Sequence, residues 1–134
     1  MNQEQHACLS RGLILALCPV IGFSSAVRAG NLVFVAGTTA VDSSGAVIGG
    51  DDPYAQTQEA LRKISAMLAE AGTDWSHVVQ TRMYLVRSEH WEHVGRAHRE
   101  VFAENPPAAT MVVVAGLLDP RMLVEIEAVA HLGL

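Results

Sequence analysis

The feature that most constrains the fold is an alternating stretch near the C-terminus, from Leu123 to Ala130. Two carboxylates, Glu125 and Glu127, stand between apolar residues in it. Because successive side chains of a β-strand point to opposite faces, the stretch predicts a strand with one apolar and one acidic face. The apolar face, which should pack on a core, holds Val124, Ile126, Ala128 and Ala130. We expect the acidic face to belong to a site.

Other stretches predict further strands. Leu32 to Ala36 and Met111 to Ala115 are apolar at nearly every position, which is typical of strands with both faces covered. Val78 to Val86 reads as another strand. Val20 to Val27 should pair with the strand at Leu32 to Gly37 across a tight turn at Arg28 to Asn31, and Asp42 to Gly45 should form the next turn.

Two segments predict helices. The first is expected to begin at Pro53, with Asp51 or Asp52 as its N-cap, and to end at Gly72. Its packing stripe should be Tyr54, Thr57, Leu61, Ile64, Leu68 and Ala71. The second should run from about Glu89 to Ala103 after a Ser88 cap, with Trp91, Val94, Val101 and Phe102 available to pack. Asn105, Pro106 and Pro107 stop it.

These elements predict a single α+β domain over residues 1–134, with a mixed sheet of about six strands and two helices on one face. Hydrophobic residues make up 50% of the chain and the mean hydropathy is +0.24. The chain should therefore bury apolar surface beyond that of a single core. Two helices cannot cover both faces of such a sheet. A partner subunit is therefore expected to cover the other face.

Several segments resemble the Rid family, the YjgF-like reactive intermediate (imine) deaminases. VEIEAVA matches intact, and GNLVFVAGTTAVDSSGAVIGGD and AQTQEALRKISAMLAEAGTDWSHVVQTRMYL resemble the family's second and third strands and its first helix and fourth strand. The similarity spans roughly residues 20 to 130. It implies the YjgF-like, chorismate-mutase-like fold and a homotrimer built around a barrel of three sheets, with ligand clefts between subunits.

The resemblance also implies site residues. In members that hydrolyse 2-imino acids, a glutamate matching Glu125 positions water, an arginine grips the substrate carboxylate, and a tyrosine holds or polarises the substrate. Here Ala109 stands in place of the arginine and Phe23 in place of the tyrosine, whereas the glycine after the second strand remains as Gly37. Family members often carry a cysteine just after the arginine, where this chain has Met111.

The lost guanidinium decides the substrate class that we expect. Arginine matches a carboxylate in a bidentate manner, and removing one partner of a buried charge pair costs ~3–5 kcal/mol. Burial of Glu125 among Phe23, Met111 and Val113 should raise its pKa, which favours a neutral or cationic ligand. Arg82 should share a face with Tyr84, opposite Val79, Met83 and Leu85. It could bind ligand, or it could pair with Glu125, Glu127 or an acid of a neighbouring subunit.

Three functions stay open. The first is an enzyme acting on a neutral or cationic imine or enamine, with Glu125 as the catalytic residue and Phe23, Gly37, Arg82, Ala109 and Met111 lining the binding site. The second is a non-catalytic trimer that binds a small ligand or a partner protein in the same cleft. The third is a true 2-imino acid deaminase that uses Arg82. Glu125 could also serve structure alone, as a hydrogen-bond acceptor at a subunit junction.

Composition and motifs exclude other classes. The net charge is −5 and the nine basic residues are dispersed, so no nucleic-acid partner is expected. His90, His93 and His98 do not share one helix face; we expect a solvated polar face and neither metal nor cofactor. Leu13 to Phe23 is too short to span a membrane, and Pro19 interrupts it, which disfavours a signal peptide. Cys8 and Cys18 form no disulfide framework, and a cytoplasmic location is expected.

Overall fold

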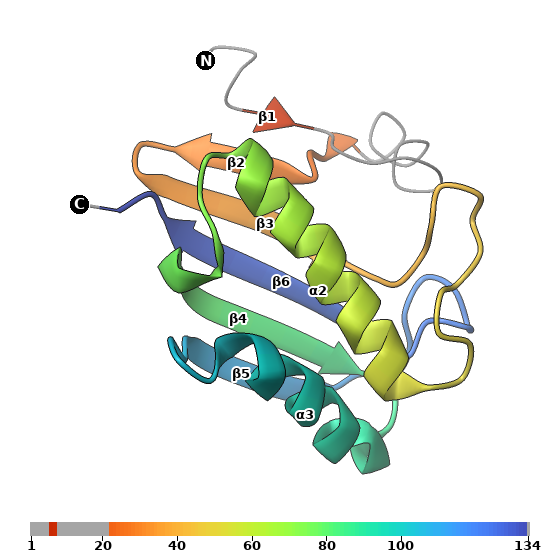
Figure 1. Ribbon diagram of the computed structural model, residues 1–134. Coiled ribbons are helices and arrows are strands. Elements are labelled where there is room, and N and C mark those ends of the chain that lie inside the picture. The colour runs from red at the N-terminus through yellow and green to blue at the C-terminus, as the bar shows by residue number, and fades with distance from the viewer. Residues whose placement is uncertain (1–5, 8–21, 134) are drawn as a thin grey trace.

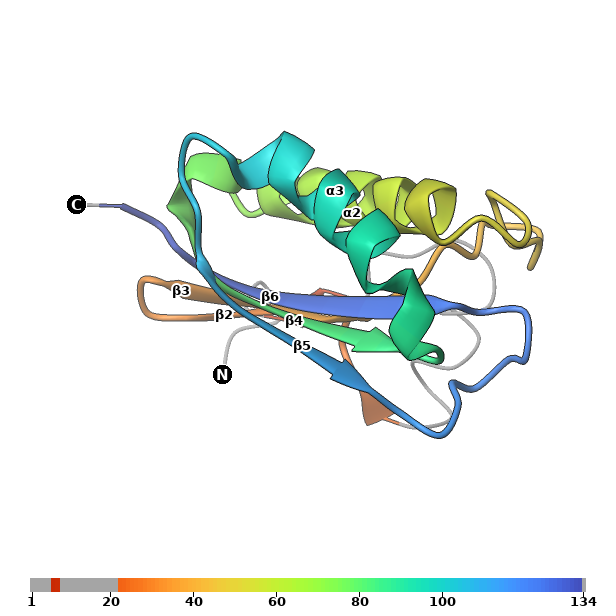
Figure 2. The same cartoon turned by 90° about the horizontal axis from the view of Figure 1, so that it is seen from below.

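A computed structural model of the chain describes residues 6–7 and 22–133 and shows one mixed sheet with two α-helices on one face (Figures 1 and 2). The strands are β1 (His6–Ala7), β2 (Ala26–Ala29), β3 (Leu32–Thr38), β4 (Val78–Leu85), β5 (Ala108–Val113) and β6 (Val124–His131). The helices are α2 (Pro53–Glu70) and α3 (Trp91–Phe102), with short 3-10 turns η3 (Trp75–His77) and η4 (Ser88–His90). This arrangement confirms the α+β class and the predicted number of strands and helices.

The strand order is β1-β2-β3-β6-β4-β5, so the acidic strand β6 lies in the interior of the sheet, between β3 and β4. Only β4 and β5 pair in parallel, with α3 as the crossover between them. Every second residue of β6 is buried under the helices, as the alternation predicts: Val124, Ile126, Ala128 and Ala130 are each at most 2% exposed. The glutamates between them point to the opposite face.

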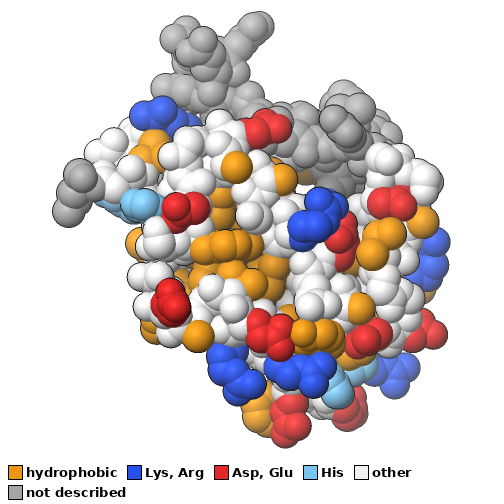
Figure 3. Space-filling view, in the orientation of Figure 1, with side chains coloured by type: hydrophobic (Ala, Val, Ile, Leu, Met, Phe, Trp, Pro, Cys, Tyr) orange, Lys and Arg blue, Asp and Glu red, His pale blue; other side chains and the backbone are white. Residues whose placement is uncertain are grey.

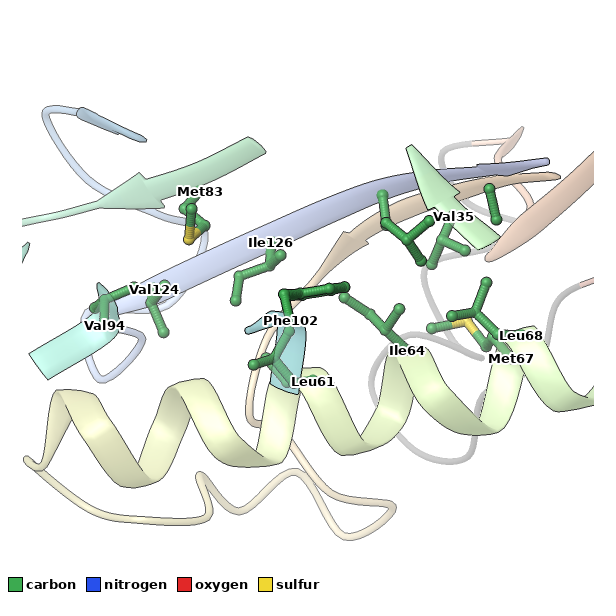
Figure 4. Packing of buried hydrophobic residues seen from close by; sticks show 14 of the residues in the cluster. Val35, Leu61, Ile64, Met67, Leu68, Met83, Val94, Phe102, Val124 and Ile126 are labelled. Carbon is green, nitrogen blue, oxygen red and sulfur yellow. The ribbon is translucent and has the colours of Figure 1, made fainter. Parts of the chain in front are cut away.

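Helix α2 supplies most of the cover. Asp52 caps its first turn by accepting a hydrogen bond from the Tyr54 backbone N–H at 2.9 Å, and Pro53 opens it. Leu61, Ile64 and Leu68 point toward the sheet, where they form one core with Val35 and Ile126 of the strands and Phe102 of α3 (Figure 4). The predicted stripe is therefore confirmed from Thr57 to Leu68, whereas Tyr54 is only partly buried and its hydroxyl donates to Glu100. Among the described residues, neither helix is long and apolar enough to cross a membrane.

Helix α3 differs from its prediction in three respects. It begins at Trp91, because Ser88–His90 winds into a 3-10 turn in which the His90 N–H bonds to the Arg87 carbonyl, so Ser88 is not its cap. The Trp91 side chain is 59% exposed rather than packed, since it stands at the helix end. His98 is not solvated: its Nε2 lies 2.9 Å from Thr81 Oγ1, its ring lies against Phe102, and burial lowers its pKa.

The predicted turns are present. β2 and β3 form a hairpin in which Ala29 pairs with Leu32, and Gly30 adopts the positive φ of 61° that the turn requires. Asp42 closes the next turn, where its carboxylate accepts hydrogen bonds from both the backbone and the hydroxyl of Ser44. The strand expected from Val20 is observed from Ala26; Leu13 to Ile21, Cys8 and Cys18 lie outside the described residues.

The expectation for Val79 was wrong. A β-bulge between Val78 and Gln80 shifts the register of β4 against β6, so Val78 faces the core and Val79 is 48% exposed. Beyond the bulge the alternation holds, with Thr81, Met83 and Leu85 buried.

The sheet face away from the helices is bare in the described chain and carries large apolar side chains. Phe34 is 43% exposed and Val112 is 41% exposed. Both stand in the interior of their strands, where water contact with apolar surface is unfavourable at about 25 cal/mol per Å². Such a face indicates contact with another protein surface.

We expect this face to make a homotrimer. Sedimentation of the full chain should give about three times its mass of 14.3 kDa. Phe34→Glu should dissociate the assembly, because it would place a charge in the apolar contact. Trp91→Glu, the same kind of change at an exposed aromatic residue of the helix layer, should leave it intact. A stable wild-type monomer at micromolar concentration would contradict the prediction.

Candidate functional site

The most constrained contact on the bare face joins Glu125 to Gly37. A Cβ built on Gly37 would lie 2.9 Å from the Glu125 carboxyl carbon and 3.1 Å from Oε1. Such distances are too short for real side chains, so the carboxylate occupies the space that any larger residue would fill. Gly37 lies within the irregularity between Val35 and Thr38, where the pairing of β3 with β6 shifts register. The structure thus brings together two residues that the sequence analysis assigned to the site.

The Glu125 carboxylate is half-buried and receives no hydrogen bond from any described residue. Burial raises the pKa of Glu125, and the negative charge of Glu127 raises it further. The predicted direction is confirmed. A structural acceptor would be expected to have donors, so this environment is more typical of a group that awaits a ligand or a partner subunit.

Glu127, in contrast, has two partners. The Tyr84 hydroxyl donates a hydrogen bond to Glu127 Oε1, and Arg82 Nη1 lies 3.5 Å from the same oxygen. This short hydrogen bond is the largest cause of a raised pKa of Tyr84. Glu127 was one of the predicted possible partners of Arg82, and the structure confirms that pairing. With half of the Arg82 side chain exposed, the ion pair contributes at most about 1 kcal/mol in a single chain.

Two cavities adjoin the predicted site residues. A cavity of about 570 Å³ lies beside α2 and the segment after β3; Phe23, Gly37 and Lys63 are among its lining residues. A second, of about 300 Å³, lies on the bare face and is lined by Phe34, Gln80, Arg82 and Glu127, among others. Phe23 and Gly37 therefore share one cavity, whereas Arg82 lines the other. Glu125 lines neither cavity.

The register corrects the expected surroundings of Glu125. Met111 pairs with Met83 and packs on the hydrophobic core, so it lies on the helix-covered face. The residue of β5 in the Glu125 row is Val112, because Tyr84 pairs with both Glu125 and Val112. Neither Met111 nor Val113 surrounds the carboxylate in the described chain.

Ala109 pairs with Thr81, and its side chain is exposed at the edge strand β5. A single subunit does not bring it to Glu125, and a longer side chain at this position would extend from the sheet edge. Because Thr81 is buried beneath the helices, Ala109 stands in the same row as Met111, on the opposite side of the sheet from Glu125.

Sequence reasoning missed the residue that fixes the start of β6. Gln56 is fully buried; its side-chain amide donates to the carbonyls of Gly50 and Arg121, and its Oε1 accepts from the Leu123 N–H at 2.9 Å. One side chain thus ties α2 to the chain two residues before Glu125. Gln56 lies outside the predicted stripe, beside Thr57, and the periodicity of the helix gave no signal for it.

The described residues contain no group of three or more His, Cys, Asp or Glu side chains placed to hold a metal ion. Of the three histidines near α3, His98 lies within hydrogen-bond distance of Thr81 and packs against Phe102.

Comparison with known proteins identifies the family. The profile described as "Endoribonuclease L-PSP" matches residues 14–132, nearly the whole chain. The chain belongs to this family, the YjgF/Rid family. An uncharacterized protein of Streptomyces coelicolor, SCO2049, is 42% identical over 112 residues, covering 84% of this chain and 83% of that protein. A RutC family protein of Pyrococcus abyssi is 34% identical over 114 residues, covering 84% and 88%.

The solved structures agree. Rv2704 of Mycobacterium tuberculosis, described as a member of the highly conserved YjgF/YER057c/UK114 family, superposes with a TM-score of 0.79 at 40% identity, covering 91% of this chain and 97% of that one. The Rid membership and fold inferred from VEIEAVA and the upstream segments are therefore confirmed.

The contact between Gly37 and Glu125 generates a prediction. Gly37→Ala should keep the fold, because its φ is ordinary and the clashing atoms are the end of a flexible side chain, but it should displace the Glu125 carboxylate. We expect an altered Glu125 carboxyl resonance by NMR and a stability change within about 1 kcal/mol. The matched control is Gly95→Ala in α3, where an added Cβ meets nothing. An unchanged Glu125 resonance in Gly37→Ala would refute the contact.

Proposed function

We propose that this Rid-family protein binds a neutral or cationic imine or enamine in a cleft between the subunits of a homotrimer and hydrolyses it there. Glu125 is the catalytic residue of this proposal, with Phe23, Gly37 and Arg82 at the cleft and with Ala109 leaving open the place of the family arginine. No cofactor is needed for this chemistry, since water and a carboxyl group suffice.

One observation carries the proposal: the Glu125 carboxylate is pressed onto Gly37, half-buried, and without a donor among the described residues. Its raised pKa lets it hold a proton nearer neutral pH than an ordinary glutamate. A protonated carboxyl can donate to an imine nitrogen, and a carboxylate can orient water or face a cation. Each of these uses suits a neutral or cationic ligand.

The charges disfavour an anionic 2-imino acid as substrate. The described side chain of Ala109 offers no cation, and Arg82 is already paired with Glu127. An anion would have to compete with that carboxylate for the guanidinium and would be repelled by two glutamates. A deaminase acting on 2-imino acids through Arg82 is therefore the weaker alternative.

A non-catalytic trimer that binds a small ligand or partner protein is the second candidate. The absence of a hydrogen-bond donor to Glu125 among the described residues supports this candidate equally well. A carboxylate without donors can bind a cationic group without reacting with it. Turnover separates the two.

The family description names an endoribonuclease, and nucleic acid remains an unexpected partner for this chain. Lys and Arg side chains on the helix-covered side are interspersed with acidic ones (Figure 3). Binding that depends on phosphate contacts needs a basic surface, and the net charge here is −5.

Glu125→Gln tests the site role. Because the folded-state pKa of Glu125 is raised, its stabilising contribution is present at low pH and lost as the pH rises through that pKa. At pH 7 the neutral glutamine should therefore match or exceed the wild type in melting temperature and keep the same oligomer. Ligand binding or turnover should be lost. A destabilised or dissociated variant would instead identify Glu125 as a structural acceptor.

The missing guanidinium gives a second test, read by hydrolysis of freshly generated 2-imino acids. The wild type should accelerate this reaction weakly or not at all, and Ala109→Arg combined with Phe23→Tyr should raise it. Losing one partner of a buried charge pair costs ~3–5 kcal/mol, so the gain should be tenfold or more. Robust wild-type turnover that Arg82→Ala abolishes, with the oligomer intact, would favour the 2-imino acid alternative.

A further inference from the structure

Helix α2 carries a lysine that reaches the chain just beyond Gly37. The Lys63 ammonium donates a hydrogen bond to the Thr39 carbonyl at 2.7 Å and another to the Val41 carbonyl at 3.0 Å. Both carbonyls belong to the buried segment that directly follows β3. Among the described residues no carboxylate pairs with Lys63, so its charge is directed at the backbone.

Gly37 lies where β3 carries one residue too many for regular pairing. Val35 pairs with Ala128 of β6. The next pair joins Thr38 to Ile126, so three steps along β3 match two steps along β6. Such an extra residue interrupts the ladder and bends the strand, as in a β-bulge. The strand could regain regular pairing by slipping one residue, and a slip would bring a residue with a Cβ into the place of the glycine.

We propose that Lys63 is a positioning residue, which keeps Gly37 against the Glu125 carboxylate by holding the chain that follows the irregularity. It acts through backbone carbonyls and not on the ligand. This inference rests on the proposed function and deepens it, because it adds a residue that places the catalytic carboxyl group. A hydrogen bond from an ammonium is stronger than one between neutral groups, which suits Lys63 to this task.

A second side chain of α2 makes the same kind of contact with the other strand. Gln56 bonds to the backbone two residues before Glu125, and Lys63 bonds to the backbone two residues after Gly37. Gln56 and Lys63 stand seven residues apart, so they project from the same side of α2, about two turns from each other. One helix therefore holds the chain on both sides of the contact between Gly37 and Glu125.

A direct contact with ligand is the alternative role for Lys63, because this residue is also among those that line the larger cavity. An ammonium has three donors, and the two carbonyls use two of them. The two roles differ in the ligand-free protein. Loss of a tether would move Gly37 there, whereas loss of a ligand contact would not.

The first measurement needs no variant. Lys63 is the only lysine of the sequence, so labelling with 15N-lysine gives a single Nζ signal. Its protons should exchange with water more slowly than those of free lysine, because two of them are held by carbonyls. Exchange as fast as in free lysine would overturn the proposal.

Lys63→Met removes the donors and keeps an unbranched side chain. In the ligand-free full chain we expect it to displace the Gly37 amide and Glu125 carboxyl resonances, and Lys63→Arg, which can donate to both carbonyls, should restore them. The matched control is Arg62→Met. That neighbouring cation is exposed and pairs with Glu59, so the same change there should leave both signals in place. Unmoved signals in Lys63→Met would show that Lys63 does not position the site.

Turnover is read with the N-methylimine of benzaldehyde, a neutral imine. Lys63→Met should lower kcat by about tenfold or more and change KM little, because a misplaced carboxyl group slows the reaction without removing a ligand contact. A rise in KM alone would identify Lys63 as a ligand contact and refute the positioning role. The proposed function itself is decided by Glu125→Gln. Displaced resonances in Lys63→Met, with unaffected binding and turnover in Glu125→Gln, would leave the tether standing and remove the proposed function.

Discussion

The alternation of β6 is the constraint on which the rest of the structure depends. Its apolar residues fill the core beneath α2, and its two glutamates occupy the other face because successive side chains cannot point the same way. A slip of one residue would bury both carboxylates and expose Val124 and Ile126, so the register is strongly specified. Since β6 lies between β3 and β4, that register also fixes what Gly37 and Tyr84 can contact.

Patterns of local periodicity made most of the fold predictable. The stripe of α2, its Asp52 cap and Pro53 start, the β2–β3 hairpin and the two faces of β6 each follow from spacing or from residue types with fixed backbone preferences. The pairing of Arg82 with Glu127 was foreseen only as one option. Strand alternation puts both on one face, but a choice among acids needs the register between β4 and β6.

The predictions that the structure corrected share a cause, since each depends on how two elements align in space. The bulge at Val79 inverts one residue of β4, and the parallel register of β5 places Met111 on the core side and Val112 beside Tyr84. His98 contacts Thr81 of β4, and the spacing of residues within a helix carries no information about a contact with a strand. Gln56 bonds to one backbone group in the loop just before α2 and to two in the distant loop before β6. Such alignments arise from the packing of whole elements rather than from local pattern.

The site depends on two levels of structure. Within one chain the sheet places Glu125 on Gly37 and gives Glu127 its partners, but the face remains open to water, which weakens every charge interaction on it. Cover by a second copy over Phe34 and Val112 would exclude that water and strengthen the repulsion between the two carboxylates. Further burial would raise the pKa of Glu125 further, because that carboxylate has no hydrogen-bond donor among the described residues. Assembly and acid strength would be coupled in this arrangement, since the apolar residues that favour association would also deepen the burial that raises the pKa of Glu125.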